Sequence, residues 1–321
     1  MFDINKIKKP IKMLAPMAGY TDSPFRQICR GLGADLTMTE LISADAIYFA
    51  LKKSEKVLLK SKTYELLQSS AAERPLFVQL FGRTPERFLV AGEFLQNRLK
   101  VDGIDINFGC SVRKVLKSGH GAALLREPKL AGDIVKILTD NLQVPISVKT
   151  RIGFTASREI IDFLPEIVAA GAVMVTLHGR TAKAGFSGDA DWETIYQVKK
   201  KYPNTLIIGN GDIKKYSEIL EHVGNLDGVA IGRGALAAPW IFKTDKTPPL
   251  KDKIEIAWKQ ARLVDAAKGN HGIIELRKNL LWYFKGLKNA HEWRQKLVIV
   301  KNLDDIKSIL KEIEKSGEIG E

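Results

Sequence analysis

The chain has 321 residues, of which 45% are apolar and 27% are charged, and its 50 Lys and Arg outnumber its 37 Asp and Glu. This length and composition exclude a disordered tail and a fibrous repeat, and they suit one large globular domain with a smaller addition. No run of about 18 apolar residues is present, and the N-terminus lacks the apolar core of a signal peptide, so we expect a cytoplasmic protein without membrane spans.

Eight short runs rich in Val, Ile and Leu recur between residues 11 and 232, and they alternate with segments of helical spacing. In chain order, we predict strands at 11–15, 35–39, 76–81, 103–108, 146–150, 173–178, 205–210 and 228–232. Helices are predicted between them at 23–33, 84–100, 127–143, 157–171, 191–203 and 214–224. This alternation is typical of the α/β class and predicts a (β/α)₈ TIM barrel.

The pattern changes near residue 243, where the alternation stops. Residues 243–253 are polar and contain prolines, as linkers do, and no β-like run follows them. Helical spacing recurs at 254–268, 273–288, 291–300 and 303–315, which predicts a small all-α helical bundle. We therefore predict a barrel domain at 1–243 and a helical domain at 254–315.

Positive charge is concentrated at the start of this helical region. Residues 251–301 contain twelve Lys or Arg and five acids, whereas residues 302–321 contain three Lys and six acids. A basic surface attracts polyanions such as RNA, although a charged helix face can also be the solvated side of a dimerisation bundle. We favour RNA contact, and the candidate cations are Lys259, Arg262, Lys268, Arg277, Lys278, Lys285 and Lys288.

Reactive and binding residues of a TIM barrel lie at the C-terminal ends of its strands. The predicted seventh and eighth strands end in GNGD (209–212) and GRG (232–234), where many barrels bind a phosphate, and Arg233 adds a charged donor. These loops predict a phosphate-bearing cofactor across the barrel mouth. A flavin suits the other strand ends: the backbone around Met17 against the ring, Gln79 as an amide partner and Lys149 as a cation. A Rossmann site is disfavoured, because GRGALA lies at the end of the barrel pattern.

Two side chains at the predicted mouth are candidates for chemistry. Cys110 follows the strand at 103–108, and an ordinary thiol, being mostly protonated at neutral pH, can donate a proton or act as a nucleophile. Cys29 lies within a predicted helix, and we interpret it as core packing. His178 closes the sixth strand. Neither the cysteines nor the histidines have metal-ligand spacing, so we expect no metal site.

Eight stretches of the barrel and one of the helical region carry a resemblance to a known family. They are APMAGYTDSPFRQICR (15–30), TELISADAI (39–47), LFVQLFG (76–82), GIDINFGCSVRKVLKSGHGAALL (103–125), VPISVKTRIGF (144–154), LHGRTAKAGFSGDADW (177–192), GNGDI (209–213), GVAIGRGALAAPWIF (228–242) and ELRKNLLWYFKGL (275–287). These stretches resemble the tRNA-dihydrouridine synthases, and within that family they are most similar to the bacterial B-type enzymes.

The resemblance implies an FMN-dependent reductase that uses NADPH to reduce specific uridines in tRNA to 5,6-dihydrouridine. Cys110 matches the family's proton donor to C5, while reduced FMN supplies hydride to C6. The positions that match FMN contacts are Pro16, Met17, Ala18, Gln79, Lys149, His178, Asn210, Gly211, Asp212, Gly232 and Arg233. The family usually has proline after this cysteine, and Ser111 here removes the restraint that proline places on φ.

Contacts with tRNA are assigned to Asn107 and Arg180 at the mouth and to Lys278 and Lys285 in the helical region. A uridine must leave its stack to reach a flavin in a barrel mouth, which calls for a positively charged surface that holds the surrounding RNA.

Two other functions remain open. A barrel flavoenzyme that acts on a free pyrimidine, as dihydroorotate dehydrogenases do, would need neither the helical region nor its charge. A non-catalytic tRNA-binding protein would have no need for Cys110, Lys149 and His178 together.

Overall fold

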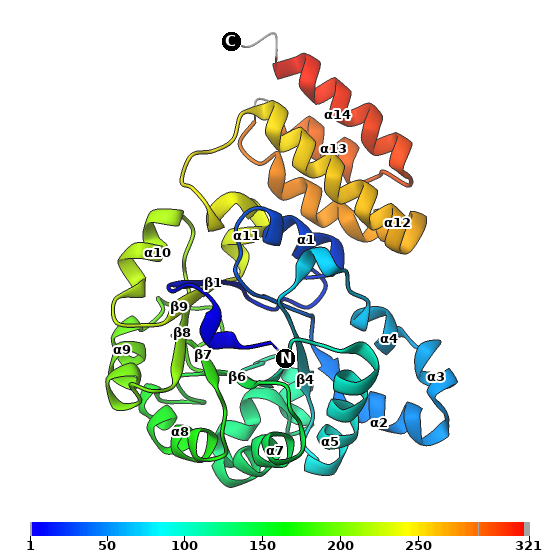
Figure 1. The fold of residues 1–321 in the computed structure, drawn as a ribbon. Helices are drawn as coiled ribbons and strands as arrows, with labels where there is room; N and C mark the ends of the chain where they lie inside the picture. Colours follow the sequence, from blue (N-terminus) through cyan, green and yellow to red (C-terminus); the bar gives the residue numbers. More distant parts are fainter. Residues whose placement is uncertain (1, 288, 318–321) are drawn as a thin grey trace.

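The computed structural model describes residues 2–287 and 289–317, and Figure 1 shows a barrel surrounded by helices with a second group of helices on one side. Within this part of the chain, nine parallel strands form one sheet in the order β1-β9-β8-β7-β6-β5-β4-β2, and β3 pairs with β4. Their bounds are β1 Ile11–Leu14, β2 Thr37–Met38, β3 Ile42–Ser43, β4 Leu76–Phe81, β5 Gly103–Phe108, β6 Ile146–Arg151, β7 Met174–His178, β8 Leu206–Asn210 and β9 Gly228–Ile231. All eight predicted strands are present.

The sheet closes on itself. β1 pairs with β9 in parallel, and an isolated bridge between Met13 and Leu36 joins β1 to the segment that leads into β2. The strands are buried as apolar runs, because helices cover the outside and side chains fill the inside. The predicted (β/α)₈ barrel of the α/β class is therefore confirmed.

The second strand position differs from the prediction, because it is split into β2 and β3. Both pieces pair with β4, and Thr39 lies between them. The hydroxyl of Thr39 accepts the backbone N–H of Gln79 at 3.0 Å, so a side chain takes the place of a ladder carbonyl there. The predicted strand at 35–39 accounts only for the first piece.

The predicted helices between the strands are present. They are α1 (Ser23–Gly31), α5 (Pro85–Phe94), α7 (Pro128–Asn141), α8 (Ile160–Ala169), α9 (Trp192–Lys201) and α10 (Tyr216–Val223), with the short α6 (Arg113–Lys117) and α11 (Arg233–Ala237) at the mouth. Short 3₁₀ turns are η1 (Ile4–Lys6), η2 (Ala71–Glu73), η4 (Gly121–Arg126), η5 (Ser157–Glu159) and η6 (Pro239–Phe242), and η3 (Leu95–Leu99) is a π-helical turn. Asp22 and Asp191 cap α1 and α9, and the side chain of each accepts a backbone N–H of the first turn.

Three further helices lie between β3 and β4, where the sequence analysis predicts none. They are α2 (Ala44–Lys53), α3 (Glu55–Leu59) and α4 (Lys62–Leu67). Each begins at a serine whose hydroxyl accepts a backbone N–H three residues further on: Ser43, Ser54 and Ser61. Helices of 5 and 6 residues, such as α3 and α4, are too short for apolar periodicity to be recognised, whereas α2, with 10 residues, is as long as the predicted α5. In all three helices the serine cap is the signal that could have found them.

The two ends of the barrel interior differ in polarity. Met13, Phe77, Met174 and Leu206 pack inside the barrel with Ile4, which comes from the N-terminal turn η1. This turn lies before β1 and covers the end at which the strands begin (Figure 1). The polar interior residues are therefore left at the opposite end, the mouth.

The helical region consists of α12 (Leu250–Tyr283), α13 (Ala290–Leu297) and α14 (Leu303–Gly317). The first two predicted helices are the two arms of α12, which meet at Gly269, where φ is +57 and ψ is −153. The arms fold back on each other, and the hydroxyl of Tyr283 donates to the side chain of Gln260. Because α12 begins at Leu250, the connection to the barrel is shorter than the predicted linker at 243–253.

These helices have an apolar core of their own, separate from that of the barrel, and α12 packs against α1 of the barrel (Figure 1). No helix in residues 2–287 and 289–317 is long and apolar enough to cross a membrane.

Candidate active site

The mouth brings together the loops that follow the first and last strands. The predicted residues Pro16, Met17 and Ala18 lie in the loop after β1. The backbone N–H of Gly19 donates to the carboxylate of Glu40, which holds this loop against the segment between β2 and β3. A Cβ on Gly232 would lie 3.4 Å from Met17 Sδ, so the loop after β9 touches the loop after β1.

Strand register aligns the polar residues of the mouth in rows, which contain predicted residues and one that was not predicted, Arg151. Arg151 at the end of β6 is opposite His178 on β7, and His178 is opposite Asn210 on β8. One row deeper, Asn107 on β5 is opposite Lys149 on β6. Residues two apart on a strand point to the same face, so the two rows face the same way.

Lys149 is the cation of the deeper row. Its Nζ donates to Asn210 Oδ1 at 3.0 Å, and because β7 lies between β6 and β8, this bond passes over the barrel interior. Asn210 Nδ2 in turn donates to the carbonyl of Ala230 at 2.7 Å. Burial, and then the charge of Arg151, lower the pKa of Lys149 to about 8. The ammonium is therefore present at neutral pH but is lost at moderately alkaline pH.

His178 is held as a neutral ring. Its Nδ1 accepts the backbone N–H of Arg180 at 3.1 Å, so the neutral imidazole carries its proton on Nε2. Burial, and then the charges of Lys149, Arg151 and Arg180, lower the pKa of His178 to about 2. The ring therefore acts as a hydrogen-bond donor of fixed tautomer and not as a general acid.

The loop after β8 is shaped by backbone constraints. Gly211 has φ +142, and a Cβ there would lie 2.6 Å from Ala190 Cβ, so only glycine fits. Asp212 follows with φ +58 and forms an ion pair with Arg180 at 2.6 Å. Burial raises the pKa of Asp212, but the hydrogen bonds from Arg180 and from the Ala190 backbone, with the charges of Arg180 and Arg233, outweigh it, and the pKa lies below its usual value. An ionised Asp212 cannot bind a phosphate through its side chain, but it orients Arg180 and lies 3.8 Å from Arg233.

Gln79 and Asn107 meet inside the barrel, next to an acidic residue that the sequence analysis does not single out. Asn107 Nδ2 donates to Gln79 Oε1 at 3.0 Å, and Gln79 Nε2 donates to Asp105 Oδ2 at 2.7 Å. Asp105 also accepts the hydroxyl of Ser147 at 2.6 Å. Burial raises the pKa of Asp105 to about 6, against the lowering effect of these two hydrogen bonds.

Cys110 is held by its backbone in the loop after β5. Its N–H donates to Asn107 Oδ1 at 2.9 Å, and its carbonyl accepts the N–H of Ala122 at 3.0 Å. These two bonds restrain the loop although Ser111 follows the cysteine in place of proline. The thiol-bearing residue is half-buried, whereas Cys29 is fully buried in α1, as the sequence analysis predicts.

Arg151 is a second residue that the sequence analysis misses. Its guanidinium donates to the carbonyl of Gly109 at 2.8 Å and to those of Thr181 at 3.1 Å and Gly185 at 3.0 Å. It therefore ties the loop that carries Cys110 to the loop after β7, and burial lowers its pKa to about 10. The available signal is the strand period of two: Arg151 lies two residues after Lys149, and Asp105 lies two before Asn107.

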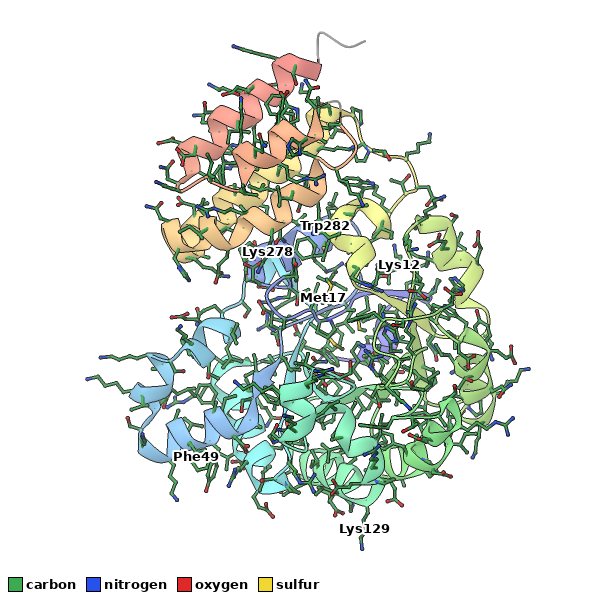
Figure 2. All side chains as sticks on the ribbon, turned by 180° about the vertical axis from the view of Figure 1, so that it is seen from behind. Lys12, Met17, Phe49, Lys129, Lys278 and Trp282 are labelled. Carbon is green, nitrogen blue, oxygen red and sulfur yellow. The ribbon has the colours of Figure 1, made fainter. Side chains whose placement is uncertain are left out.

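The four residues assigned to tRNA have different surroundings. Asn107 is buried in the interior, and Arg180 is only 5% exposed, with its guanidinium bonded to Asp212 and to the carbonyls of Ser187 and Gly188. Arg180 thus links the loop after β7 to Asp212 in the loop after β8. Lys278 lies at the junction of α12 and the barrel, with Nζ 4.8 Å from the ring of Tyr20, and Figure 2 places Lys278 and Trp282 close to Met17.

The other candidate cations of the helical region also differ. Lys259, Arg262 and Lys285 are exposed. Lys268, in contrast, forms ion pairs of 2.9 Å with both Asp22 and Glu275, so it links α12 to the start of α1. Arg277 donates to the carbonyl of Val300. These two cations are used within the fold, and Lys288 lies outside the described residues.

A metal-binding group was not expected from the sequence. In the described ranges, no cluster of three or more His, Cys, Asp or Glu side chains is arranged to hold a metal ion.

Comparison with known proteins identifies the family. The model of the family described as Dihydrouridine synthase matches residues 13–316. A probable tRNA-dihydrouridine synthase from Aquifex aeolicus is 36% identical over 322 aligned positions, which cover 97% of each chain. A probable tRNA-dihydrouridine synthase 1 from Synechocystis is 32% identical, over 92% of this chain and 84% of that protein.

Solved structures support the fold. A complex of 2-naphthoyl-CoA reductase aligns with a TM-score of 0.55 and 11% identity, over 73% of this chain and 49% of that chain. The structure of TcOYE with pHBA aligns with a TM-score of 0.51 and 12% identity, over 71% of this chain and 86% of that chain. The family match runs through the barrel, the mouth and the helices after it, and so confirms the resemblance read from the sequence: the chain belongs to the dihydrouridine synthase family, a family of oxidoreductases that act on tRNA.

Proposed function

We propose that this protein reduces specific uridines in tRNA to 5,6-dihydrouridine, with FMN as its cofactor, NADPH as the reductant and Cys110 as the proton donor. The observation that carries the proposal is the placement of Cys110 by Asn107 in the same mouth as Lys149 and His178. The family match over residues 13–316 supports the reaction class, and it extends through the helices that a free pyrimidine would not require.

The mouth residues fit a flavin. Met17 offers an apolar side chain and backbone for a ring face, Gln79 an amide, and Lys149 a cation that suits an electron-rich ring edge. Thr176 Oγ1 is buried without a hydrogen-bond partner among the described residues and is in register with Lys149, so a polar ligand or an ordered water would satisfy it.

The loops after β8 and β9 fit the phosphate end. The backbone of Asn210, Gly211 and Gly232 can approach the phosphate of FMN closely. The backbone N–H of Asp212, and not its carboxylate, suits an anion. The side chain of Arg233 is 59% exposed and is able to reach a ligand. When bound, reduced FMN supplies the hydride for C6 of the uridine. Cys110 Sγ holds the proton that is delivered to C5, and His178 Nε2–H donates a hydrogen bond within the mouth.

We assign cofactor binding and catalysis to the barrel at 1–243 and tRNA binding to the helical region at 254–315. The barrel holds cofactor and target base. Lys278 lies over the ring of Tyr20, and Lys285 Nζ lies 5.6 Å from the ring of Trp282, which Figure 2 shows close to Met17, so both lysines are placed to meet RNA that approaches the mouth. Arg180 is reassigned from direct tRNA contact to orienting the mouth, because its guanidinium is bonded inside the protein.

The proposal is tested with tRNA from a strain that lacks this gene. Incubation with the protein, FMN and NADPH should produce dihydrouridine, which is measured by mass spectrometry of the digested tRNA. Reduction of free uracil or uridine without any dihydrouridine in tRNA would favour the free-pyrimidine function instead.

Replacing Arg233 with alanine is expected to weaken FMN binding by about 10- to 150-fold, because a charge-assisted hydrogen bond typically contributes roughly 1.5–3 kcal/mol. Fluorescence titration of the flavin-free protein measures the affinity. Riboflavin lacks the phosphate, so its affinity should not change. Lys129, an exposed cation that Figure 2 shows far from Met17, provides the control Lys129→Ala. Equal losses for FMN and riboflavin would contradict a phosphate contact of Arg233.

FMN binding is expected to weaken as the pH rises through about 8, the pKa to which burial lowers Lys149. The charged ammonium is the form that attracts an electron-rich ring edge, so the affinity is highest below this pKa and falls by up to roughly tenfold per pH unit above it. Titrations of FMN between pH 6.5 and 9.5 measure the effect. Lys149→Met should bind FMN more weakly and with no such step, and a wild-type affinity that stays constant up to pH 9.5 would refute the contact.

A further inference from the structure

A chain of hydrogen bonds inside the barrel links Asp105 to the backbone of Cys110. Gln79 Nε2 donates to Asp105 Oδ2 at 2.7 Å, and Asn107 Nδ2 donates to Gln79 Oε1 at 3.0 Å. Asn107 Oδ1 then accepts the N–H groups of Gly109 at 3.1 Å and of Cys110 at 2.9 Å. The side chains of Asp105, Gln79 and Asn107, which form this series of hydrogen bonds, are buried, so their polar atoms depend on one another for partners.

The direction of the chain follows from what its ends can do. Backbone N–H groups only donate, so Asn107 turns its oxygen toward Cys110 and its NH₂ toward Gln79. Gln79 must then present its oxygen to Asn107 and its NH₂ to Asp105. Asp105 ends the chain by supplying an acceptor. Without an acceptor at residue 105, the Gln79 amide is free to turn over, and a reversed Gln79 sets its NH₂ against that of Asn107.

We propose that Asp105 is a positioning residue for the reaction: its side-chain oxygen orients the amides of Gln79 and Asn107 and, through them, the backbone of Cys110. This inference rests on the proposed function, in which Gln79 contacts the flavin and Cys110 supplies the proton. Asp105 acts through these residues, since its own hydrogen-bond partners are Gln79 and Ser147.

Ser147 determines which property of Asp105 matters. Its hydroxyl donates to Asp105 Oδ1 at 2.6 Å, but a hydroxyl accepts as readily as it donates. Asparagine at position 105 would give its oxygen to Gln79 and its NH₂ to Ser147, and the chain would stay intact without the charge. Leucine has a similar size and provides no acceptor. The two substitutions therefore separate the hydrogen-bond acceptor from the negative charge.

Asp105→Leu and Asp105→Asn are compared with the wild-type protein by three measurements. These are the affinity for FMN, the rate at which iodoacetamide alkylates the flavin-free protein, and kcat and KM with tRNA. Cys29 is fully buried, so alkylation reports on Cys110. Asp105→Leu should weaken FMN binding by about tenfold, change the alkylation rate several-fold, and lower kcat with little change in KM. Asp105→Asn should remain within about twofold of the wild type in all three.

Two outcomes would overturn the proposal. If the asparagine variant loses as much as the leucine variant, the negative charge of Asp105 is what matters, for example because that charge raises the pKa of Lys149. If the leucine variant behaves like the wild type, the chain does not position anything. A wild-type protein that binds FMN but forms no dihydrouridine would contradict the proposed function and not the role of Asp105. In that case the flavin affinity and the alkylation rate of the variants still test whether Asp105 positions Gln79 and Cys110.

A second pair of variants decides the matter if Asp105→Leu does not fold. Asn107→Asp places an acceptor opposite Gln79 Oε1 and forces the Gln79 amide to reverse, so that its oxygen then faces the Asp105 carboxylate. Adding Asp105→Asn provides an NH₂ for that oxygen and restores a continuous chain of opposite direction. The double variant should recover the urea midpoint and the alkylation rate that Asn107→Asp loses. A double variant as impaired as Asn107→Asp, or more so, would overturn the proposal.

Discussion

Replacing Cys110 with alanine is expected to slow dihydrouridine formation in tRNA by about 10²- to 10⁴-fold, the range typical of a lost general acid. FMN affinity and the reduction of bound flavin by NADPH should be nearly unchanged. The reason is that the loop is held by the main chain of Cys110, through Asn107 and Ala122, and alanine keeps both bonds. Stopped-flow absorbance follows the two half-reactions separately.

Two variants serve as controls for this result. Cys29→Ala removes the other thiol, which is buried in α1, and should leave both half-reactions at wild-type rates. Cys110→Ser keeps a group of similar size that is a much weaker acid, so it should resemble the alanine variant in uridine reduction. If Cys110→Ala slows flavin reduction as much as uridine reduction, the cysteine is a structural residue and another group provides the proton.

Reversing the charges of Lys278 and Lys285 together is expected to make tRNA binding weaker and less sensitive to salt. The logarithm of the affinity for a nucleic acid falls linearly with the logarithm of the salt concentration, with a slope of about −0.7 to −0.9 per neutralised phosphate. Losing two phosphate contacts should therefore make this slope shallower by about 1.4 to 1.8. Lys278 lies over Tyr20 at the junction with the barrel, and Lys285 is exposed on the same region. Filter binding at several salt concentrations measures the slope, while NADPH-dependent flavin reduction should not change.

The matched control reverses two exposed lysines of α14, Lys311 and Lys315. This variant has the same change in net charge as Lys278→Glu with Lys285→Glu, so it separates a local contact from general repulsion of RNA. The control should keep the wild-type slope. Equal slopes in the two double variants would show that tRNA does not bind at the junction of α12 and the barrel.

The barrel strands were predictable because each is an apolar run of four to six residues that is buried on both faces, apart from the split second position. The break in the helical region was also predictable, since Gly269 interrupts the helical spacing where the backbone leaves the helical conformation. In contrast, α3 and α4 were missed because helices of 5 and 6 residues show little periodicity, and α2, with 10 residues, was missed although the Ser43 cap marks its start. The interruption between β2 and β3 depends on Thr39 bonding to Gln79, a residue forty positions away.

The candidate site was predictable where position along a strand was enough. Gln79, Asn107, Lys149, His178 and Asn210 were chosen because they end or nearly end strands, and parallel strands in a barrel present those ends to one mouth. Spacing along the chain does not reveal which partner each side chain meets. The roles of Arg180, bonded to Asp212, and of Lys268, bonded to Asp22, depend on loops and helices that pack together only in the folded protein.

The sequence by itself determined the parallel barrel, the helical region after it and the strand-end position of Cys110, because apolar runs and their periodicity are local properties of the chain. Only the tertiary structure decided that Asp105 bonds to Gln79, that Arg151 bonds to the loop of Cys110, and that Arg180 and Lys268 are already paired. Hydrogen bonds and ion pairs between distant residues depend on register and on distances of about 3 Å, which no local pattern encodes.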